Sequence, residues 1–283
     1  MADSAATGTT AAAAGRTGVE RIAAAFASAR DEGRAALMPY LMGGFPDADG
    51  AAAVAGAYAD AGADLIELGI PFSDPLADGP VIHAAATAAL ESGATLDSAL
   101  EACAAVGSRV PVVAMVYTNM VLAGGGPKVI AERLAEAGAA GAIVPDLPIE
   151  EGAAIREALT AQGLALVPLV APTTPLERRR LICAEAEGFV YLVSTVGVTG
   201  EREALPDELA ALIDACKAEA PVPVAVGFGI GTPEQAAAVG ARADGVIIGS
   251  RLVREATEAA DAGAAAKRVG GFLAEARAAL ARS

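Results

Sequence analysis

Two carboxylates beside a loop rich in Gly and Pro are the residues in this sequence best suited to acid–base chemistry. Glu67 lies within the apolar run ADLIEL, where an ionised carboxylate is unfavourable unless it is paired or its pKa is raised. A carboxyl group with a raised pKa can donate a proton near neutral pH. Asp74 and Asp78 follow in GIPFSDPLADGP at 69–80, although aspartates in such turns commonly bond to the backbone. We favour Glu67 paired with Asp78, the alternative for Glu67 being a strand-end carboxylate that reaches solvent or an arginine.

Glycines that follow the last two apolar runs are suited to bind phosphate. GFGIGTPEQ at 227–235 and IIGSRLV after it place Gly229, Gly249 and Ser250 between an expected strand and an expected helix. Backbone N–H groups in such turns, at the positive end of a helix dipole, bind anions. GVTG at 197–200 is a third turn of this kind. The alternative interpretation is that these are ordinary tight turns.

Aromatic residues at or near strand ends are candidates to line an apolar pocket, although each is alternatively a core residue. They are Tyr40, Phe72, Tyr117, Tyr191 and Phe228.

Other reaction classes lack the residues they need. The single histidine, His83, cannot build a metal site that draws on several imidazoles. The lysines, Lys128, Lys217 and Lys267, fall in expected helices, which leaves none at a strand end for a Schiff base. Proton transfer by carboxylates on a phosphorylated small molecule remains.

Composition also limits the partners and the location. The chain carries 35 Asp plus Glu against 20 Lys plus Arg, a net charge of −15, which disfavours a nucleic-acid surface. The densest basic run, 178–180, is expected to be a solvated helix face. Apolar runs are too short for a membrane helix, so we expect a soluble protein. Cys103, Cys183 and Cys216 lack CxxC spacing and indicate reduced thiols in the cytoplasm.

Eight short apolar runs, each bounded by Gly, Pro or Asp, alternate with Ala-rich segments of helical period. The expected strands are 36–42, 63–68, 111–116, 141–146, 164–170, 188–194, 222–226 and 244–248. The expected helices include 128–137 and 207–218, and Gly62, Gly138 and Gly163 stand where helix-ending glycines are common. This alternation predicts an α/β fold, a (β/α)8 TIM barrel. The open doubly wound alternative needs a Gly-rich turn after its first strand, and GGFPD at 43–47 fits that poorly.

The two ends of the chain are expected to differ in structure. Residues 1–18 have the composition of a disordered tail, and 19–283 are expected to form a single catalytic barrel. An extra N-terminal helix at 19–32 places Val19, Ile22, Ala23 and Phe26 on one stripe that could close the barrel's N-terminal end. The interval between 63–68 and 111–116 is the longest, so we expect an addition there.

The segment ELGIPFSDPLADGP at 67–80 resembles the tryptophan synthase α subunit family. PYLMGGFPD, VYTNMV, VPDLP, YLVSTVGVTG, VGFGIGTPEQ and IIGSRLV follow the same pattern in order, so the resemblance covers about 20–280. It implies a lyase of tryptophan biosynthesis that cleaves indole-3-glycerol phosphate to indole and glyceraldehyde 3-phosphate by a retro-aldol reaction.

The resemblance also implies roles for individual residues. Glu67 would move protons at indole C3 and at the glycerol hydroxyl, and Asp78 would stabilise positive charge at the indole N–H. The phosphate would be held by Thr199, Gly200, Gly229, Gly249 and Ser250. Tyr191 and Phe228 would flank the ligand, and Tyr40 would lie above the indole.

The family works as an αββα heterotetramer, so the resemblance implies a β subunit that receives indole. Pyridoxal phosphate is expected only in that β partner, and no cofactor or metal in this chain. Loops 71–80 and 195–205 would be mobile lids that touch β. His83 stands where the family usually has Gln. A lyase that frees indole without a β subunit stays open as an alternative, whereas an inactive barrel that only activates β is disfavoured by intact Glu67 and Asp78.

Overall fold

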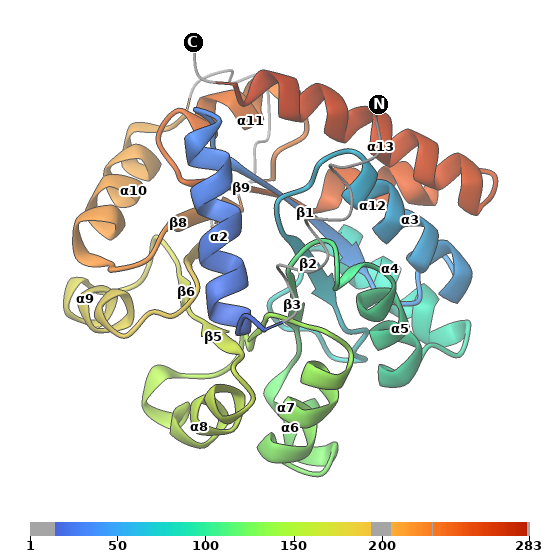
Figure 1. Cartoon of the computed structure of the whole chain (residues 1–283), viewed down its shortest axis with the longest axis horizontal. Helices are drawn as coiled ribbons and strands as arrows, with labels where there is room; N and C mark the ends of the chain where they lie inside the picture. The colour runs from blue at the N-terminus through green and yellow to red at the C-terminus, as the bar shows by residue number, and fades with distance from the viewer. Residues whose placement is uncertain (1–14, 194–204, 228, 282–283) are drawn as a thin grey trace.

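A barrel of parallel strands inside a ring of helices forms the protein (Figure 1). The computed structural model describes residues 15–193, 205–227 and 229–281. The strand segments are β1 Ala36–Met42, β2 Ile66–Gly69, β3 Val112–Met115, β4 Gly141–Ile143, β5 Ala165–Val167, β6 Leu169–Val170, β7 Val190–Val193, β8 Val224–Gly227 and β9 Gly245–Ile248. They follow one another in the sheet in the order β5-β4-β3-β2-β1-β9-β8-β7-β6, so the predicted barrel is confirmed.

The fifth predicted strand is divided in two at Pro168. Segment β5 pairs with β4, and β6, which follows after this single proline, pairs with β7. Proline has no N–H to donate to a neighbouring strand, but its carbonyl accepts a hydrogen bond from Tyr191 N at 3.0 Å. Because one strand supplies both edges of the sheet, the barrel closes.

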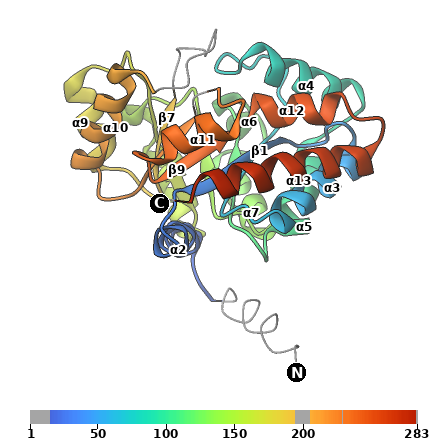
Figure 2. The same ribbon diagram turned by 90° about the horizontal axis from the view of Figure 1, so that it is seen from above.

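Helices follow the strands and cover the outside of the barrel (Figures 1 and 2). They are α2 Gly18–Asp31, α3 Ala48–Asp60, α4 Pro80–Glu91, α5 Leu96–Val106, α6 Thr118–Ala123, α7 Pro127–Glu136, the short 3-10 helix η1 Ile149–Glu151, α8 Ala153–Ala161, α9 Leu176–Ala184, α10 Asp207–Glu219, α11 Pro233–Gly240, α12 Ser250–Thr257 and α13 Ala262–Ala279. Two helices, α4 and α5, lie between β2 and β3 and account for the long interval there. The predicted helices at 128–137 and 207–218 are α7 and α10. Gly62, Gly138 and Gly163 have φ angles of 81°, 79° and 70°, which fits the helix-ending role expected of them.

Helix α2 closes one end of the barrel, on the side opposite α4 and α12 (Figure 2). Its N-terminus approaches so closely that a Cβ on Gly18 would lie 2.0 Å from the carbonyl oxygen of Ala140. Arg21 donates hydrogen bonds to the backbone carbonyls of Gly138 and Gly107 at that end.

The apolar face of α2 differs in part from the predicted stripe. Ile22 and Phe26 are buried as expected, and Ala29 is buried with them. Val19 and Ala23 are exposed, so that part of the prediction is wrong. The buried positions are spaced by four and three residues, the pattern of one helix face, and they pack on the barrel interior rather than on another helix.

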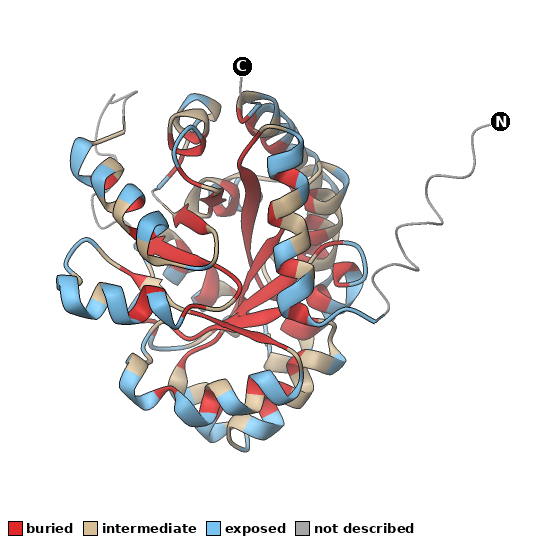
Figure 3. Cartoon of the chain, turned by 60° about the vertical axis from the view of Figure 1, so that its left-hand side comes forward, coloured by how far each residue is buried: buried red, intermediate tan, exposed pale blue. Residues whose placement is uncertain are grey.

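The strands are buried along most of their length (Figure 3), and their residues alternate between a core under the helices and a core inside the barrel. In β2, Ile66 and Leu68 face the helices, whereas Leu65, directly before β2, faces the barrel interior together with Met38 and Val113. Since side chains two positions apart share a face, Glu67 points into the barrel one layer closer to its C-terminal end.

The cysteines, the basic residues and the helix lengths are the features in which the structure bears on the predictions from composition. The three cysteines are free and buried. The basic run 178–180 lies on α9, and each of its arginines pairs with a carboxylate. All three lysines lie in helices. Within the described part of the chain, every helix is too short or too polar to span a bilayer. Residues 1–14 lie outside the described residues, so the disordered tail stays a prediction.

Candidate active site

A cavity of about 630 Å³ opens at the C-terminal end of the barrel, where the strands lead into their loops. It brings together nearly all the described residues that the sequence singled out for the site. Those on its wall are Tyr40, Glu67, Asp78, Tyr191, Gly229, Gly249 and Ser250. Thr199, Gly200 and Phe228 lie outside the described residues, as does most of the predicted lid at 195–205.

Glu67 is a buried carboxyl group in an apolar strand. Its residue is 2% exposed, and neither carboxyl oxygen has a hydrogen-bond partner among the described residues. Burial, and then the negative charge of Asp78, raise the pKa of Glu67 to about 8. The nearby Tyr191 hydroxyl opposes this shift, although it does not complete a hydrogen bond in this geometry. Glu67 is therefore mostly protonated at pH 7 and can both give and take a proton near neutrality.

Asp78 lies in the loop between β2 and α4, directly before Gly79, the N-cap residue of α4. Burial raises its pKa, while a hydrogen bond from the Tyr117 hydroxyl and the charge of His83 act in the opposite direction. His83 itself is exposed on α4. Asp74, the other aspartate of this loop, is exposed and does not line the cavity. Asp78 is thus the loop carboxylate that lines the cavity together with Glu67.

Tyr117 supports Asp78 from behind rather than lining the cavity. Its hydroxyl accepts a hydrogen bond from Ala77 N at 3.1 Å and interacts with the Asp78 carboxylate. Its ring stacks on Phe72 with 5.1 Å between ring centroids. The loop that carries Asp78 is therefore held by Tyr117 at two points. The sequence placed Tyr117 and Phe72 near the site, but it did not indicate this contact.

Two buried tyrosines form the aromatic wall. Tyr40 on β1 is paired in register with Glu67 on β2, so the two side chains enter the cavity side by side. Burial together with the charges of Asp78 and Glu67 raises the pKa of Tyr40. Burial and the adjacent Glu67 likewise raise the pKa of Tyr191 on β7. Both hydroxyls stay protonated at neutral pH and can donate hydrogen bonds.

The glycine turns line the same cavity as the two carboxylates. No side chain caps α12, which begins at Ser250 directly after Gly249, so the N–H groups of its first turn can bind an anion. Gly229 has a φ of 64°, a conformation that favours glycine. Helix α11 begins only at Pro233 and is capped by the Thr232 side chain. Gly229 therefore contributes through a loop and not through a helix start, which corrects that part of the prediction.

Several wall residues escaped the sequence reasoning. They are apolar or small groups, and they include Ile82, Met115, Pro145, Leu169, Thr174 and Ile247. Position in the sequence could have indicated four of them, because Met115, Pro145, Leu169 and Ile247 are each the second-to-last residue of a predicted strand. Among the described residues, no cluster of three or more His, Cys, Asp or Glu side chains is arranged to hold a metal ion.

The arrangement combines a protonated buried carboxyl, a second carboxylate, an apolar aromatic wall and an anion-binding turn. These are the groups needed to hold a phosphorylated aromatic molecule and to move a proton onto and off its carbon skeleton.

Comparison with known proteins points to one family. A family model described as tryptophan synthase alpha chain matches residues 26–279. The tryptophan synthase alpha chain of Synechococcus sp. (strain CC9902) is 46% identical over 259 residues, which cover 90% of this chain and 96% of the relative. That of Prochlorococcus marinus (strain MIT 9313) is 47% identical over 259 residues, covering 90% and 94%. A solved structure of Mycobacterium tuberculosis tryptophan synthase superposes with a TM-score of 0.85 at 37% identity, covering 93% of this chain and 99% of that chain.

Proposed function

The chain belongs to the tryptophan synthase alpha chain family, lyase-type enzymes of tryptophan biosynthesis, and we propose that it cleaves indole-3-glycerol phosphate by a retro-aldol reaction. The products are indole and glyceraldehyde 3-phosphate. The observation that carries the proposal is the protonated Glu67, without a hydrogen-bond partner among the described residues, in a cavity that Asp78 and the α12 N-terminus also line.

The reaction moves one proton within the substrate, and Glu67 is suited to move it. The Glu67 carboxyl donates its proton to indole C3, which places positive charge on the indole ring. The resulting carboxylate then removes the proton from the hydroxyl on the glycerol carbon attached to C3. The bond between this glycerol carbon and C3 then breaks, and the carbon becomes the carbonyl carbon of glyceraldehyde 3-phosphate. The electron pair of the broken bond returns to the indole ring and removes its positive charge. Glu67 ends protonated again, so a pKa of about 8 serves both steps.

Asp78 and the aromatic wall act on the intermediate in which the indole ring carries a positive charge. The Asp78 carboxylate accepts a hydrogen bond from the indole N–H and stabilises its positive charge. Tyr40 and Tyr191 flank the ring, and Phe228 is assigned the same role by resemblance. Gly229, Gly249 and Ser250 bind the phosphate through backbone N–H groups, together with Thr199 and Gly200 of the GVTG turn. Backbone binding explains how a chain with a net charge of −15 holds an anion.

Membership of the family implies a β-subunit partner. We propose an αββα heterotetramer in which indole passes to β, and in which pyridoxal phosphate belongs to β alone. A role of the Asp78 loop in docking to the β subunit is supported by its Leu76 side chain, which is 91% exposed. The free, buried cysteines support our assignment to the reducing cytoplasm.

The experiment is to incubate the purified chain with indole-3-glycerol phosphate and to quantify both products, alone and with added β subunit. We expect indole and glyceraldehyde 3-phosphate in equal amounts, and faster release with β. Since the chain has no Trp, substrate binding can also be followed by indole fluorescence. Failure to bind or cleave this substrate in either condition would overturn the proposal.

A further inference from the structure

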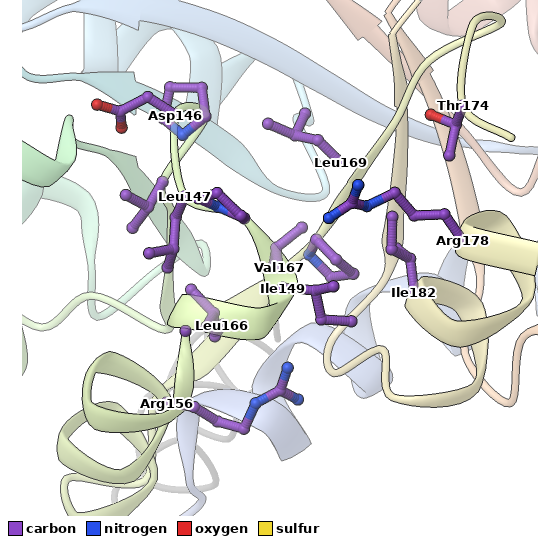
Figure 4. A pocket seen from close by; sticks show the side chains of 15 residues that line it. Asp146, Leu147, Ile149, Arg156, Leu166, Val167, Leu169, Thr174, Arg178 and Ile182 are labelled. Atoms are coloured by element: carbon purple, nitrogen blue, oxygen red, sulfur yellow. The ribbon is translucent and has the colours of Figure 1, made fainter.

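A second cavity of about 410 Å³ opens beside the active-site cavity, on the side of α8 and α9 (Figure 4). It results from the break in the fifth strand. The pairing of β4 with β5 ends at Ile143 and Val167, after which Pro168 turns the chain so that β6 pairs with β7 instead. The segments 144–148 and 166–169 diverge there, and the space between them is left open.

The wall of this cavity is apolar and its rim is cationic. Leu147, Ile149 and Ile182 contribute hydrocarbon surface. The guanidinium groups of Arg156 on α8 and Arg178 on α9 extend toward Ile149, which lies between them in Figure 4. The volume lies within the range of small-molecule sites in proteins. An apolar body with one negative group matches these surfaces.

The two arginines retain donors for such a group. Arg178 bonds to Glu150 only through Nη2, so its Nη1 and Nε make no hydrogen bond with a described residue. Arg156 donates Nη1 to the carbonyl of Glu185 at 2.9 Å and pairs through Nη2 with the half-exposed Glu185 carboxylate at 3.5 Å, which leaves its Nε without a described partner. Arg178 and Glu150 are each about half exposed, so solvent weakens their pairing. A ligand carboxylate can therefore bind without displacing Glu150.

The one carboxylate in the wall is directed elsewhere. Asp146 accepts hydrogen bonds from Thr118 N at 2.8 Å and from Thr118 Oγ1 at 3.0 Å, at the start of α6. Its charge is thus engaged at the edge of the cavity that faces away from α8 and α9, as Figure 4 also shows for its side chain.

We propose that this cavity is a second small-molecule site, which binds a monocarboxylate with an aliphatic or aromatic body. The body contacts Leu147, Ile149 and Ile182, and the carboxylate binds Arg178 and Arg156.

The position of the site links it to the first cavity. Pro145, Leu169 and Thr174 line both cavities. A ligand that fixes these shared side chains changes the affinity of the active-site cavity, and by linkage the reverse holds by the same factor. This coupling rests on the proposed function, whereas the existence of the second site does not.

The direct test is calorimetric titration of the full chain with octanoate, with octan-1-ol as the uncharged comparison. We expect saturable binding at one site, with a Kd in the millimolar range or below. Arg178→Gln should raise the Kd for octanoate at least about tenfold, because a charge-assisted hydrogen bond is lost, and should leave octan-1-ol unaffected. Arg180→Gln is the matched control, since Arg180 lies on the same helix, is 56% exposed and pairs with Glu177 and Glu219 away from the cavity. Absence of saturable binding, or equal losses in the two variants, would overturn the site.

A cavity-filling variant decides where octanoate binds. Gly152 lines the second cavity but not the first, and its φ of −76° suits any residue. A Cβ there would meet nothing closer than Ile149 O at 3.4 Å, so Gly152→Leu should fold and occupy the space. Octanoate binding should be lost in this variant while binding of glycerol 3-phosphate is retained. Unchanged octanoate binding would place the ligand elsewhere and overturn the proposal.

The coupling is tested by titrating glycerol 3-phosphate with and without saturating octanoate. We expect its Kd to change by about fivefold or more in the wild type and to stay constant in Gly152→Leu. An unchanged Kd in the wild type would overturn the coupling. A chain that fails to bind glycerol 3-phosphate at all would refute the proposed function and the coupling together, while the octanoate titration still decides the site.

Discussion

Replacing Glu67 by Gln should make the protein more stable at alkaline pH, at the expense of its activity. A buried carboxyl without a hydrogen-bond partner is tolerated while it is protonated, and ionising it in the folded state is unfavourable. Glutamine has nearly the same shape and never ionises. The variant therefore removes the unfavourable ionisation and leaves the packing of Leu65 and Tyr40 around it in place.

The magnitude follows from the pKa. Burial raises the pKa of Glu67 from 4.5 to about 8, so between these values the folded state binds a proton that the unfolded state has lost. The stabilisation from this group is complete below about pH 4.5 and is lost as the pH rises through 8. At about 1.4 kcal/mol per pH unit, the wild type should lose about 4 kcal/mol from this group between pH 5 and 8.5.

The assay is urea unfolding of the wild type and of Glu67→Gln at pH 5 and at pH 8.5. The variant's stability relative to the wild type should rise by about 4 kcal/mol across this interval. Glu234→Gln is the control, because hydrogen bonds with its own backbone N–H and with the Thr232 side chain lower the pKa of Glu234, so this group titrates at lower pH than Glu67. A relative stability of Glu67→Gln that stays constant between the two pH values would refute the argument that Glu67 is buried as the neutral acid.

Other expected outcomes concern the groups around the site and the barrel. Tyr117→Phe removes a hydrogen bond that lowers the pKa of Asp78. The acidic limb of the pH profile of kcat/KM should therefore move to higher pH, and kcat/KM should fall about tenfold. An acidic limb at the same pH as in the wild type would contradict this role of Tyr117. Gly227→Ala would place a Cβ 2.7 Å from Tyr191 Oη and should lower kcat/KM at least about tenfold. Gly56→Ala is the control and should leave kcat/KM unchanged, because a Cβ at Gly56 would meet no atom within 4 Å. Equal rates of indole formation by the two variants would argue against crowding of Tyr191. Asp64→Asn removes the buried carboxylate partner of Arg34, which is 4% exposed, and leaves it only the half-exposed Glu32, so it should cost about 3 kcal/mol in urea unfolding. Loss of the exposed Asp60–Arg109 pair in Asp60→Asn should cost less than about 1 kcal/mol, and similar losses in the two variants would contradict the difference in burial.

The strands were predictable because their apolar runs are short and end at Gly, Pro or Asp. The division of the fifth strand was not, although Pro168 is visible in the sequence, since it depends on which neighbour each half pairs with. The stripe of α2 was partly misassigned for a similar reason. Ala23 and Val19 are apolar, and only the barrel end against which the helix packs selects Ile22, Phe26 and Ala29 for burial.

The candidate site was predictable where a residue type conflicts with its surroundings. The sequence alone shows that Glu67 places a carboxylate within an apolar strand, and this mismatch marks the residue for a role in the site. The hydrogen bond between Tyr117 and the loop of Asp78 joins residues 40 positions apart, and no local pattern encodes it. The contribution of Leu169 and Thr174 to two cavities likewise exists only once the barrel has closed.

The central claim is that the buried Glu67 carboxyl transfers the proton in the cleavage of indole-3-glycerol phosphate. The most direct measurement is the rate of indole release by Glu67→Gln, beside its affinity for glycerol 3-phosphate. The account predicts no detectable release together with a Kd within about twofold of the wild type, because the amide cannot exchange the proton and the phosphate turn is untouched. Indole release by Glu67→Gln at the wild-type rate would contradict it.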